Sequence, residues 1–485
     1  MARSKERPRQ HRKPTHLVLF PCPLQGHITP MLQLATILHS KGFSITIVHT
    51  QFNSPNPSNY PNFNFEHISD GLSADQAQKY DVMALVALLN INCHDPFSDW
   101  MARMLSEQDP RDMIACIVSD ALMHFTQSVA DHLKIPRIIL RASSATSFVT
   151  CAAFPLLREK GYLPIQDPES ETPVSELPPL RIKDLPNIST DDSDTLYQLV
   201  AHMNNETRNS SGLIYNSFDY IEETALAKIR QDFPIPFFPI GPLHKYSSGS
   251  SSSLLPHDQS CMVWLDKQVA GSVIYVSFGS LASMEKEELV EIAWGLANSG
   301  QPFLWVVRPG LVRGSAMAEM PDGFEEQTRE RGLIVKWAPQ QEVLAHPSVG
   351  CFWTHNGWNS TVESICEGVP MLCWPCFGDQ KVNARLVSHV LKVGVQLENG
   401  LEREKIGWAI RRLMVEKEGE EMKKRIRKLK EKADRCLRKG GSSYESLDRL
   451  VNCILSFKRT TPGFSPTGSG SIPQTSSRGD WGESG

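Results

Sequence analysis

Short apolar runs alternate with longer stretches of helical periodicity along the first part of the chain. Residues 16–20 and 43–48 are apolar runs of strand length. Between them, apolar residues recur at helical spacing from Met31 to Leu38 after a turn over residues 21–30. A strand, a helix and a second strand in succession predict a βαβ unit and therefore a parallel sheet. The same order returns within residues 116–140.

A second series of such units begins after residue 260. The predicted strands are 272–278, 303–307, 333–337, 349–353 and 371–374. A helix is predicted at 285–297, and residues 403–437 carry Lys, Arg and Glu at helical spacing. Prolines at 237–242 and a Ser/Gly-rich run at 247–253 separate the two series, as is typical of a flexible linker.

We therefore expect an α/β protein of two doubly wound, Rossmann-like domains that face a cleft, where such sheets bind ligands. The predicted parts are a basic disordered tail (1–15), an N-terminal domain (16–242), a linker (243–260), a C-terminal domain (261–457) and a disordered tail (458–485). The last helix can pack back on the N-terminal domain.

Composition narrows the class of protein. Of the 485 residues, 40% are hydrophobic and 21% charged, which is ordinary for a globular protein and excludes a wholly disordered chain. Lys and Arg number 50 against 54 Asp and Glu, a net charge of -4 that argues against a nucleic-acid binder. The 11 cysteines are scattered and odd in number, which favours reduced thiols. Because no apolar run approaches about 18 residues, we expect a cytoplasmic protein without stable membrane insertion.

The stretch from Trp337 to Gln380 holds the most informative chemistry. A strand is predicted to end at Thr354, a glycine turn follows, and a helix begins near Trp358. A helix N-terminus placed after a strand offers free N–H groups and a positive dipole end to phosphate. Trp337 can stack on a base, and the Glu363 carboxylate can accept ribose hydroxyls.

These 44 residues resemble, without insertion or gap, the signature of plant family-one UDP-sugar glycosyltransferases. The resemblance extends over residues 17–457 and includes the Pro-Leu-Gln-Gly-His-Ile-Thr-Pro turn at 23–30 and Ser-Phe-Gly-Ser at 277–280. Residues 40–47 are most similar to the subgroup with steviol-glycoside and other terpenoid glucosyltransferases. The resemblance implies the glycosyltransferase B fold, with the donor on the C-terminal domain and the acceptor on the N-terminal one.

The resemblance also implies a role for each matching residue of the donor site. The implied donor residues are Trp337 and Ala338 for uracil, Gln340 and Glu363 for ribose, Ser280, His355, Asn359 and Ser360 for the diphosphate, and Trp358, Asp379 and Gln380 for the sugar. A final Gln in the signature favours UDP-glucose. No cofactor and no metal are expected, because His355 and the helix end replace the metal.

His27, just after the first strand, is the candidate catalytic base. A hydroxyl is a poor nucleophile, and an imidazole with a pKa near neutrality can take its proton as the C–O bond forms. The resemblance assigns Asp120 as the carboxylate that holds the other ring nitrogen. The acceptor pocket is expected to include Gly26, Ala142 and Ser143, and to be bordered by segments near Asn90 and Leu199.

Two other motifs compete with this interpretation. Cys373 and Cys376 have the spacing of a thioredoxin-like redox pair, but they lie inside the donor signature and are interpreted as packing residues. Asp192-Ser193-Asp194 is similar to a metal-binding Asp-x-Asp motif, but it is predicted to lie in a polar loop and not at a strand end.

We therefore expect a monomeric, inverting glucosyltransferase. It would move glucose from UDP-glucose to a hydroxyl or carboxyl of a small lipophilic plant metabolite, which can be a terpenoid, a flavonoid or other phenolic, or a hormone. The alternative is a non-catalytic UDP-sugar-binding protein on the same fold. A nicotinamide oxidoreductase is disfavoured because no Gly-x-Gly-x-x-Gly follows a predicted strand.

Overall fold

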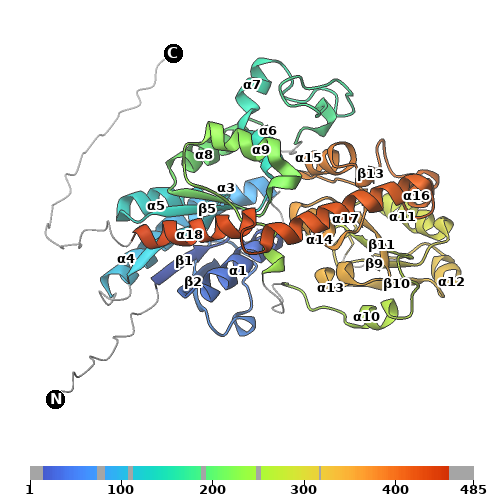
Figure 1. Ribbon diagram of the computed structural model, residues 1–485, viewed down its shortest axis with the longest axis horizontal. Coiled ribbons are helices and arrows are strands. Elements are labelled where there is room, and N and C mark those ends of the chain that lie inside the picture. Colours follow the sequence, from blue (N-terminus) through green and yellow to red (C-terminus); the bar gives the residue numbers. More distant parts are fainter. Residues whose placement is uncertain are drawn as a thin grey trace, which may run out of the picture.

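Two parallel sheets organise the protein, one in each half of the chain (Figure 1). The computed structural model describes residues 15–73, 82–107, 113–186, 193–246, 253–315 and 318–457. The predicted terminal tails lie outside these residues, except for Thr15, which begins the first strand.

The first sheet has seven parallel strands in the order β3-β2-β1-β4-β5-β6-β7. The strands are β1 (Thr15–Phe20), β2 (Phe43–Thr50), β3 (Asn64–Ile68), β4 (Ile114–Asp120), β5 (Arg137–Arg141), β6 (Gly212–Tyr215) and β7 (Phe237–Pro239). Both predicted βαβ units are present. The pattern had not indicated β3, β6 or β7, which lie on the outer parts of the sheet.

The second sheet has six parallel strands in the order β10-β9-β8-β11-β12-β13. The strands are β8 (Val273–Ser277), β9 (Phe303–Val306), β10 (Gly332–Val335), β11 (Val349–Thr354), β12 (Met371–Cys373) and β13 (Gly394–Gln396). Each of the five predicted strands is found, and β13 is additional. In both sheets the strand order reverses once, so both are doubly wound as expected.

Helices connect the strands in both halves. Those of the first half are α1 (Gln25–Ser40), α3 (Val82–Asn92), α4 (His94–Ser106), α5 (Thr126–Leu133), α6 (Ala145–Ala152), α7 (Phe154–Glu159), α8 (Ser193–Asn209) and α9 (Asp219–Asp232). Those of the second half are α10 (Ser260–Leu265), α11 (Lys286–Ser299), α12 (Phe324–Thr328), α13 (Gln340–Ala345), α14 (Trp358–Glu367), α15 (Gln380–Arg385), α16 (Arg403–Met414), α17 (Lys417–Leu437) and α18 (Ser442–Phe457).

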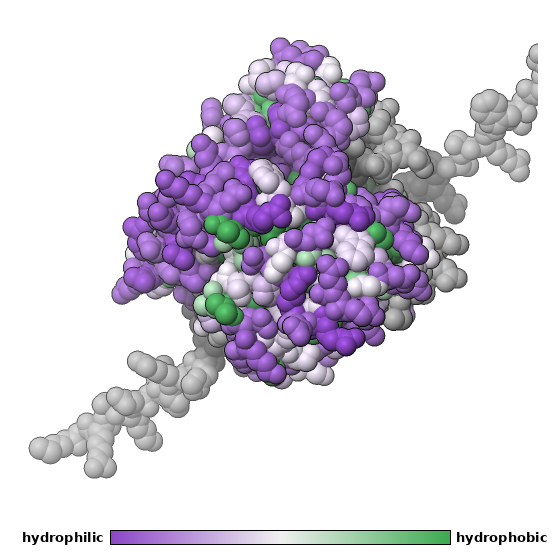
Figure 2. All heavy atoms as spheres, turned by 90° about the vertical axis from the view of Figure 1, so that its right-hand side faces the viewer, coloured by the Kyte–Doolittle hydropathy of each residue, from purple (hydrophilic) through white to green (hydrophobic). Residues whose placement is uncertain are grey.

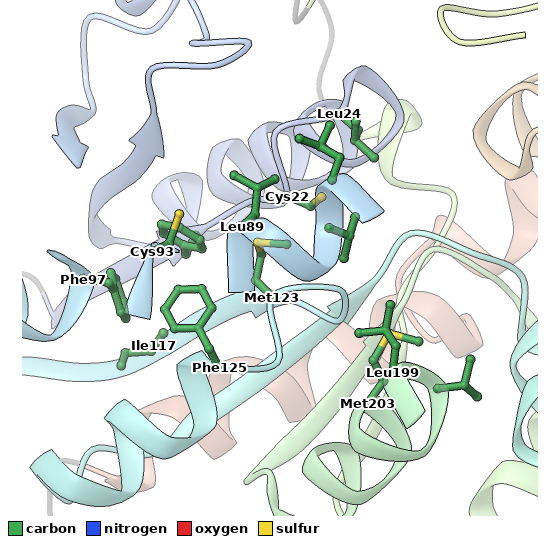
Figure 3. Packing of buried hydrophobic residues seen from close by; sticks show 14 of the residues in the cluster. Cys22, Leu24, Leu89, Cys93, Phe97, Ile117, Met123, Phe125, Leu199 and Met203 are labelled. Atoms are coloured by element: carbon green, nitrogen blue, oxygen red, sulfur yellow. The ribbon is translucent and has the colours of Figure 1, made fainter. Parts of the chain in front are cut away.

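The strands are continuous apolar runs because helices bury both of their faces. In β1, Leu17 and Leu19 pack into one core cluster, whereas Val18 and Phe20 pack into another on the opposite face. Figure 3 shows part of the second cluster, where Leu89 of α3 lies near the turn that follows β1. Parallel sheets covered on both faces have this pattern.

The chain crosses back to the first domain at its end. Helix α17 lies along the C-terminal half and α18 along the N-terminal half (Figure 1). Leu447, Leu450 and Ile454 of α18 are buried in the core of the first sheet. The Ser443 hydroxyl, in the first turn of α18, also donates a hydrogen bond to the Gly241 carbonyl at 2.6 Å.

Helix α1 begins six residues earlier than its apolar periodicity indicated, at Gln25 instead of Met31. The segment Gln25–Thr29 is polar or small apart from Ile28, so hydrophobic spacing does not reveal its first turn. Pro30 therefore lies inside the helix.

Hydrophilic side chains dominate the end of the molecule seen in Figure 2, where hydrophobic ones are isolated among them. Such a surface is typical of a face in contact with water. Within the described residues, the helices are all too short or too polar to cross a membrane.

Candidate active site

The predicted site residues lie where the strand order of each sheet reverses. In the first sheet, His27 follows β1 and Asp120 ends the neighbouring strand β4. In the second, Ser280 follows β8 and His355 follows the neighbouring β11. In open α/β sheets, ligands bind at the carboxyl ends of the strands at this reversal point.

His27 and Asp120 form a hydrogen-bonded pair. The His27 Nδ1 lies 2.8 Å from Asp120 Oδ2, and the Leu122 N–H donates to Asp120 Oδ1 at 2.8 Å. The Asp120 side chain is fully buried, whereas that of His27 is 24% exposed. A carboxylate accepts, so Nδ1 is the donor and Nε2 is the ring nitrogen left for a ligand.

The surroundings of His27 raise its pKa above the ordinary value. Burial lowers the pKa, but the charge of Asp120 and its hydrogen bond raise it, as does the charge of Asp379 from the other domain. Arg141 opposes them weakly. The net result is an imidazole that binds a proton more strongly than a free histidine, which suits a base.

Asp379 precedes α15 and is held by Asn383, one turn along that helix. Asn383 Nδ2 donates to Asp379 Oδ2 at 3.1 Å and to the Asn356 carbonyl at 3.0 Å. Burial raises the pKa of Asp379, and Asn383, His27 and the Ser144 N–H favour its charged form. Asn383 was not among the predicted site residues, although its four-residue spacing from Asp379 could have indicated the contact.

A proline in α1 creates a contact between the two domains. Pro30 has no N–H, so the Gly26 carbonyl, four residues earlier, lacks its helical partner. The Asn359 amide of the second domain donates to that carbonyl at 2.7 Å. Gly26, predicted as an acceptor contact, and Asn359, predicted as a diphosphate contact, are thus joined to each other.

Trp358 begins α14 and is also engaged by the first domain. Its indole is buried and donates to the Asn216 carbonyl at 2.8 Å. The Asn216 amide lies 3.3 Å from Asn359 Oδ1. The indole N–H of Trp358, which was predicted to face the sugar, is therefore already bonded to the first domain. Asn216 was missed, and nothing in its local sequence marks it.

His355 lies between two glycines and is neutral at physiological pH. A Cβ on either Gly279 or Gly357 would approach its Nε2 to 2.6 Å, so only glycine leaves room for the ring. Burial, assisted by the charge of Arg308 and opposed by the Ser277 carbonyl, lowers the pKa of His355 to about 4. A neutral imidazole still has one N–H that can donate to a phosphate oxygen.

The residues predicted to hold the ribose form one partly buried hydrogen-bonded set. Gln340 Nε2 donates to Glu363 Oε2 at 2.7 Å and to the Ser360 hydroxyl at 2.9 Å. Gln341, which the sequence analysis passed over, donates to the other Glu363 oxygen at 2.8 Å. Burial raises the pKa of Glu363, and the two amides oppose that shift. The carboxylate is thereby fixed in position.

Trp337 and Ala338 follow β10 on the edge of the second sheet. The Trp337 indole N–H donates to the Ser253 hydroxyl at 2.7 Å, so its ring orientation is fixed from the linker. Ala338 is the next residue in the chain, and its side chain is buried. Ser280 is partly exposed just beyond β8.

Gln380 is buried at the start of α15. Its Oε1 accepts from the Cys376 N–H at 2.8 Å and the Phe377 N–H at 3.1 Å, which leaves its amino group to donate elsewhere. The predicted acceptor residues Ala142 and Ser143 follow β5, where Ala142 is buried and Ser143 partly exposed.

Two segments predicted to border the acceptor are part of the first domain's core. Leu199 of α8 is buried beside Met203 (Figure 3). Asn90 of α3 donates to the Leu122 carbonyl at 2.8 Å and accepts from the Phe125 N–H at 3.1 Å. Asn90 thus fixes the loop that follows Asp120.

The competing motifs do not form sites of their own. Cys373 and Cys376 are unpaired, and burial raises the pKa of each thiol to about 12, which is unsuited to redox chemistry. Asp192 lies outside the described residues, whereas Asp194 belongs to α8, so the predicted polar loop ends earlier than expected. Among the described residues, no group of three or more His, Cys, Asp or Glu side chains could hold a metal ion.

Comparisons with known proteins cover most of the chain. The family described as "UDP-glucoronosyl and UDP-glucosyl transferase" matches residues 26–432. UDP-glycosyltransferase 76B1 of Arabidopsis thaliana is 50% identical over 442 residues, which cover 91% of this chain and 98% of that protein. UDP-glycosyltransferase 76G1 of Stevia rebaudiana is 48% identical over 461 residues, which cover 92% and 98%.

A solved structure is similar over the same extent. Phytolacca americana UGT2, complexed with UDP-2fluoro-glucose and pterostilbene, has a TM-score of 0.77 at 27% identity. The match covers 91% of this chain and 100% of that one, so the expected two-domain fold is confirmed. The chain therefore belongs to the UDP-glucoronosyl and UDP-glucosyl transferase family and is a plant family-one UDP-glycosyltransferase with the glycosyltransferase B fold.

Proposed function

We propose that this enzyme transfers glucose from UDP-glucose to a hydroxyl or carboxyl group of a small lipophilic plant metabolite, with inversion at the anomeric carbon. The observation that carries the proposal is the joint arrangement of His27, Asp120 and Asp379. The first two form a 2.8 Å pair in one domain, and Asp379 of the other domain acts electrostatically on His27. A base from one domain and a sugar-binding carboxylate from the other fit the transfer of a sugar from a donor on the second domain to an acceptor on the first.

In the proposed reaction, His27 Nε2 takes the proton of the acceptor hydroxyl. The oxygen attacks the anomeric carbon, a C–O bond forms, and the bond to the diphosphate breaks with its electron pair leaving on UDP. Asp120 holds the ring through Nδ1 and stabilises the imidazolium. Attack opposite the leaving group converts an α-linked donor into a β-glucoside. A carboxyl acceptor is already ionised near neutrality, so it depends on His27 less.

The second domain would bind the leaving diphosphate without a metal or other cofactor. The ten-residue helix α14 presents its N-terminus beside Ser360, and the neutral His355 adds an N–H donor. Ser280 and Asn359 complete the proposed phosphate contacts. Residues 17–457 carry a net charge of -10, so the protein as a whole does not attract a negatively charged diphosphate. Binding of the diphosphate would therefore depend on these local hydrogen-bond donors.

For the rest of the donor, Trp337 would stack on uracil and the Ala338 backbone would bind its edge. The fixed Glu363 carboxylate, with Gln340, would accept the ribose hydroxyls. Asp379 and the free amino group of Gln380 would bind vicinal sugar hydroxyls, which supports glucose as the transferred sugar. The complex of the Phytolacca relative with UDP-2fluoro-glucose supports a UDP-sugar donor here.

The acceptor would bind on the first domain, near Gly26, Ala142 and Ser143. Terpenoids, phenolics and hormones are all compatible with that position. We also propose that the enzyme acts as a monomer in the cytoplasm, where its 11 unpaired cysteines would stay reduced.

The direct experiment incubates the full chain with UDP-glucose and a panel of hydroxylated and carboxylated plant metabolites, read by product mass. A gain of one hexose, with a β linkage by NMR and formation of UDP, is the expected result. UDP binding without any product from the whole panel would favour the non-catalytic alternative.

A further inference from the structure

Six charged side chains join the two domains at a point away from the base and the donor. Residues 171–185 form a loop that folds back on itself through an antiparallel bridge between Pro173 and Arg181, and we name this loop the strap. Within the strap, Arg181 and Lys183 reach Glu398, which follows β13 of the other domain. Arg181 Nη2 lies 2.7 Å from Glu398 Oε1, and Lys183 Nζ lies 2.9 Å from Glu398 Oε2. One carboxylate thus binds two cations across the domain boundary.

The strap belongs structurally to the first domain. Val174, Leu180 and Leu185 are buried in the core cluster that contains Val18 and Phe20 of β1. Because these apolar anchors hold the strap on one domain, its ion pairs with Glu398 hold the other domain against it.

Low exposure makes these charges sensitive to the loss of a partner. The side chains of Asp184, Lys183 and Arg181 are 1%, 7% and 12% exposed. Arg181 meets Asp184 through two parallel bonds of 2.8 Å and also meets Glu171 at 2.8 Å. A buried charge is costly unless it is paired. Loss of one partner would therefore leave a buried charge unpaired, which a surface ion pair would not.

The same strap holds one end of α15. Arg385, the last residue of that helix, donates through Nε to the Pro179 carbonyl at 3.1 Å and lies 3.6 Å from Asp184. Val382 of α15 is buried in the core cluster of the first domain. The opposite end of α15 carries Asp379 and Gln380. A helix of six residues is only about 9 Å long, so a shift at Arg385 is transmitted to Asp379.

We propose that Arg181, Glu398 and Arg385 are positioning residues for glucosyl transfer, which fix α15 between the domains so that Asp379 faces His27. This inference rests on the proposed function. It assigns the three residues no contact with substrate. It also separates two properties: sugar placement needs the strap, whereas the residues proposed to bind UDP are held by bonds that do not involve the strap, such as Gln340 to Glu363.

The test uses Glu398→Gln, which removes one charge and keeps the side-chain shape. Its matched control is Glu291→Gln. Glu291 binds Arg403 through backbone and side-chain nitrogens, but both residues lie within the second domain. The two glutamates are similarly exposed, at 30% and 26%.

For Glu398→Gln, we expect kcat/KM for UDP-glucose to fall about tenfold while the Kd for UDP changes less than about twofold. Glu291→Gln should change neither quantity beyond about twofold. Arg385→Gln should reproduce the effect of Glu398→Gln. The proposal is overturned if Glu398→Gln and its control behave alike, or if UDP binding weakens in parallel with turnover.

Hydrogen exchange provides a readout that does not depend on activity. Amides of residues 171–185 and 380–385 should exchange faster in Glu398→Gln than in wild type or in Glu291→Gln, and unchanged exchange would overturn the proposal. A wild-type protein that makes no glucoside would refute the proposed function instead, and the exchange measurement would still decide whether the strap holds α15.

Discussion

Two histidines lie at the reversal points of the two sheets, on strands that are not equivalent, and have opposite electrostatic surroundings. His27 follows β1 and His355 follows β11, both at the reversal point of their sheets. A buried carboxylate contacts His27, and the pKa of that ring is raised. His355 lies between glycines, near Arg308, and its pKa is lowered to about 4. The fold supplies the position, and the neighbours decide whether the imidazole acts as a base or as a neutral donor.

The difference follows the chemistry of each half. An acceptor hydroxyl has to lose a proton, so its domain needs a proton acceptor with a charged partner. A diphosphate already carries its charge and needs hydrogen-bond donors, which a neutral imidazole and a helix N-terminus provide. Each of the following substitutions alters the surroundings of one histidine and spares the other.

The largest effect is expected for His27→Ala. Loss of the base should reduce transfer to a hydroxyl acceptor by about 10²- to 10⁴-fold. UDP affinity, measured by calorimetry, should remain that of wild type because no donor residue is removed. Undiminished turnover would refute the assignment of the base, and lost UDP binding would mean that the two sites are not separable.

Asp120→Asn should reduce kcat by roughly 10²- to 10³-fold, because the ring loses its charged partner and its fixed tautomer. It should also change the pH profile. Asp120 raises the pKa of His27, so its neutralisation lowers that pKa. The acid limb of kcat/KM, where activity appears as His27 loses its proton, should therefore move to lower pH. A limb that stays in place would show that another group controls it.

A smaller effect is expected at the glycines around His355. Gly279→Ala introduces both a contact with the ring and a strained backbone, since Gly279 has a φ of +72°. We expect UDP binding to weaken about 10- to 100-fold, because the displaced His355 ring loses a hydrogen bond to a charged phosphate, which is worth of order 1.5–3 kcal/mol. Gly357 has an ordinary φ of -55°, so Gly357→Ala adds the contact with the ring without the backbone strain and should weaken binding about tenfold. Neither substitution should move the acid limb of the pH profile, and a shift in that limb would break the separation of the two histidines.

No effect is expected from metal removal. If His355 and the start of α14 bind the diphosphate, EDTA should leave the rate of glucosyl transfer unchanged after exhaustive dialysis. Inhibition by EDTA that Mg²⁺ or Mn²⁺ reverses would contradict the role given to the neutral imidazole.

Local sequence patterns predicted most of the sheet structure, whereas the donor role of residues 337–380 came from the family resemblance and stays a prediction. Strands β1, β2, β4 and β5 are apolar runs because both of their faces are buried, and this makes them visible in the sequence. β3 was not visible because it lies at the sheet edge and its residues include Asn64, Glu66 and His67. β13 has one apolar residue, Val395, between a glycine and a glutamine, so it forms no apolar run.

The contacts between the domains could not be predicted in this way. Arg181 and Glu398 are 217 residues apart, and Trp358 and Asn216 are 142 apart, so no spacing rule connects them. The Gly26 carbonyl is an intermediate case. Pro30 indicates from the sequence that this carbonyl lacks a helical partner, but only the structure identifies Asn359 as its substitute.

The most direct test of the contrast is an NMR titration of the histidine rings in the full chain, with His27→Gln and His355→Gln used for assignment. The account predicts that His27 titrates above its ordinary pKa of about 6.5 and that His355 stays neutral down to about pH 4. A His27 that titrates below 6.5, or a His355 that becomes protonated near neutrality, would contradict it.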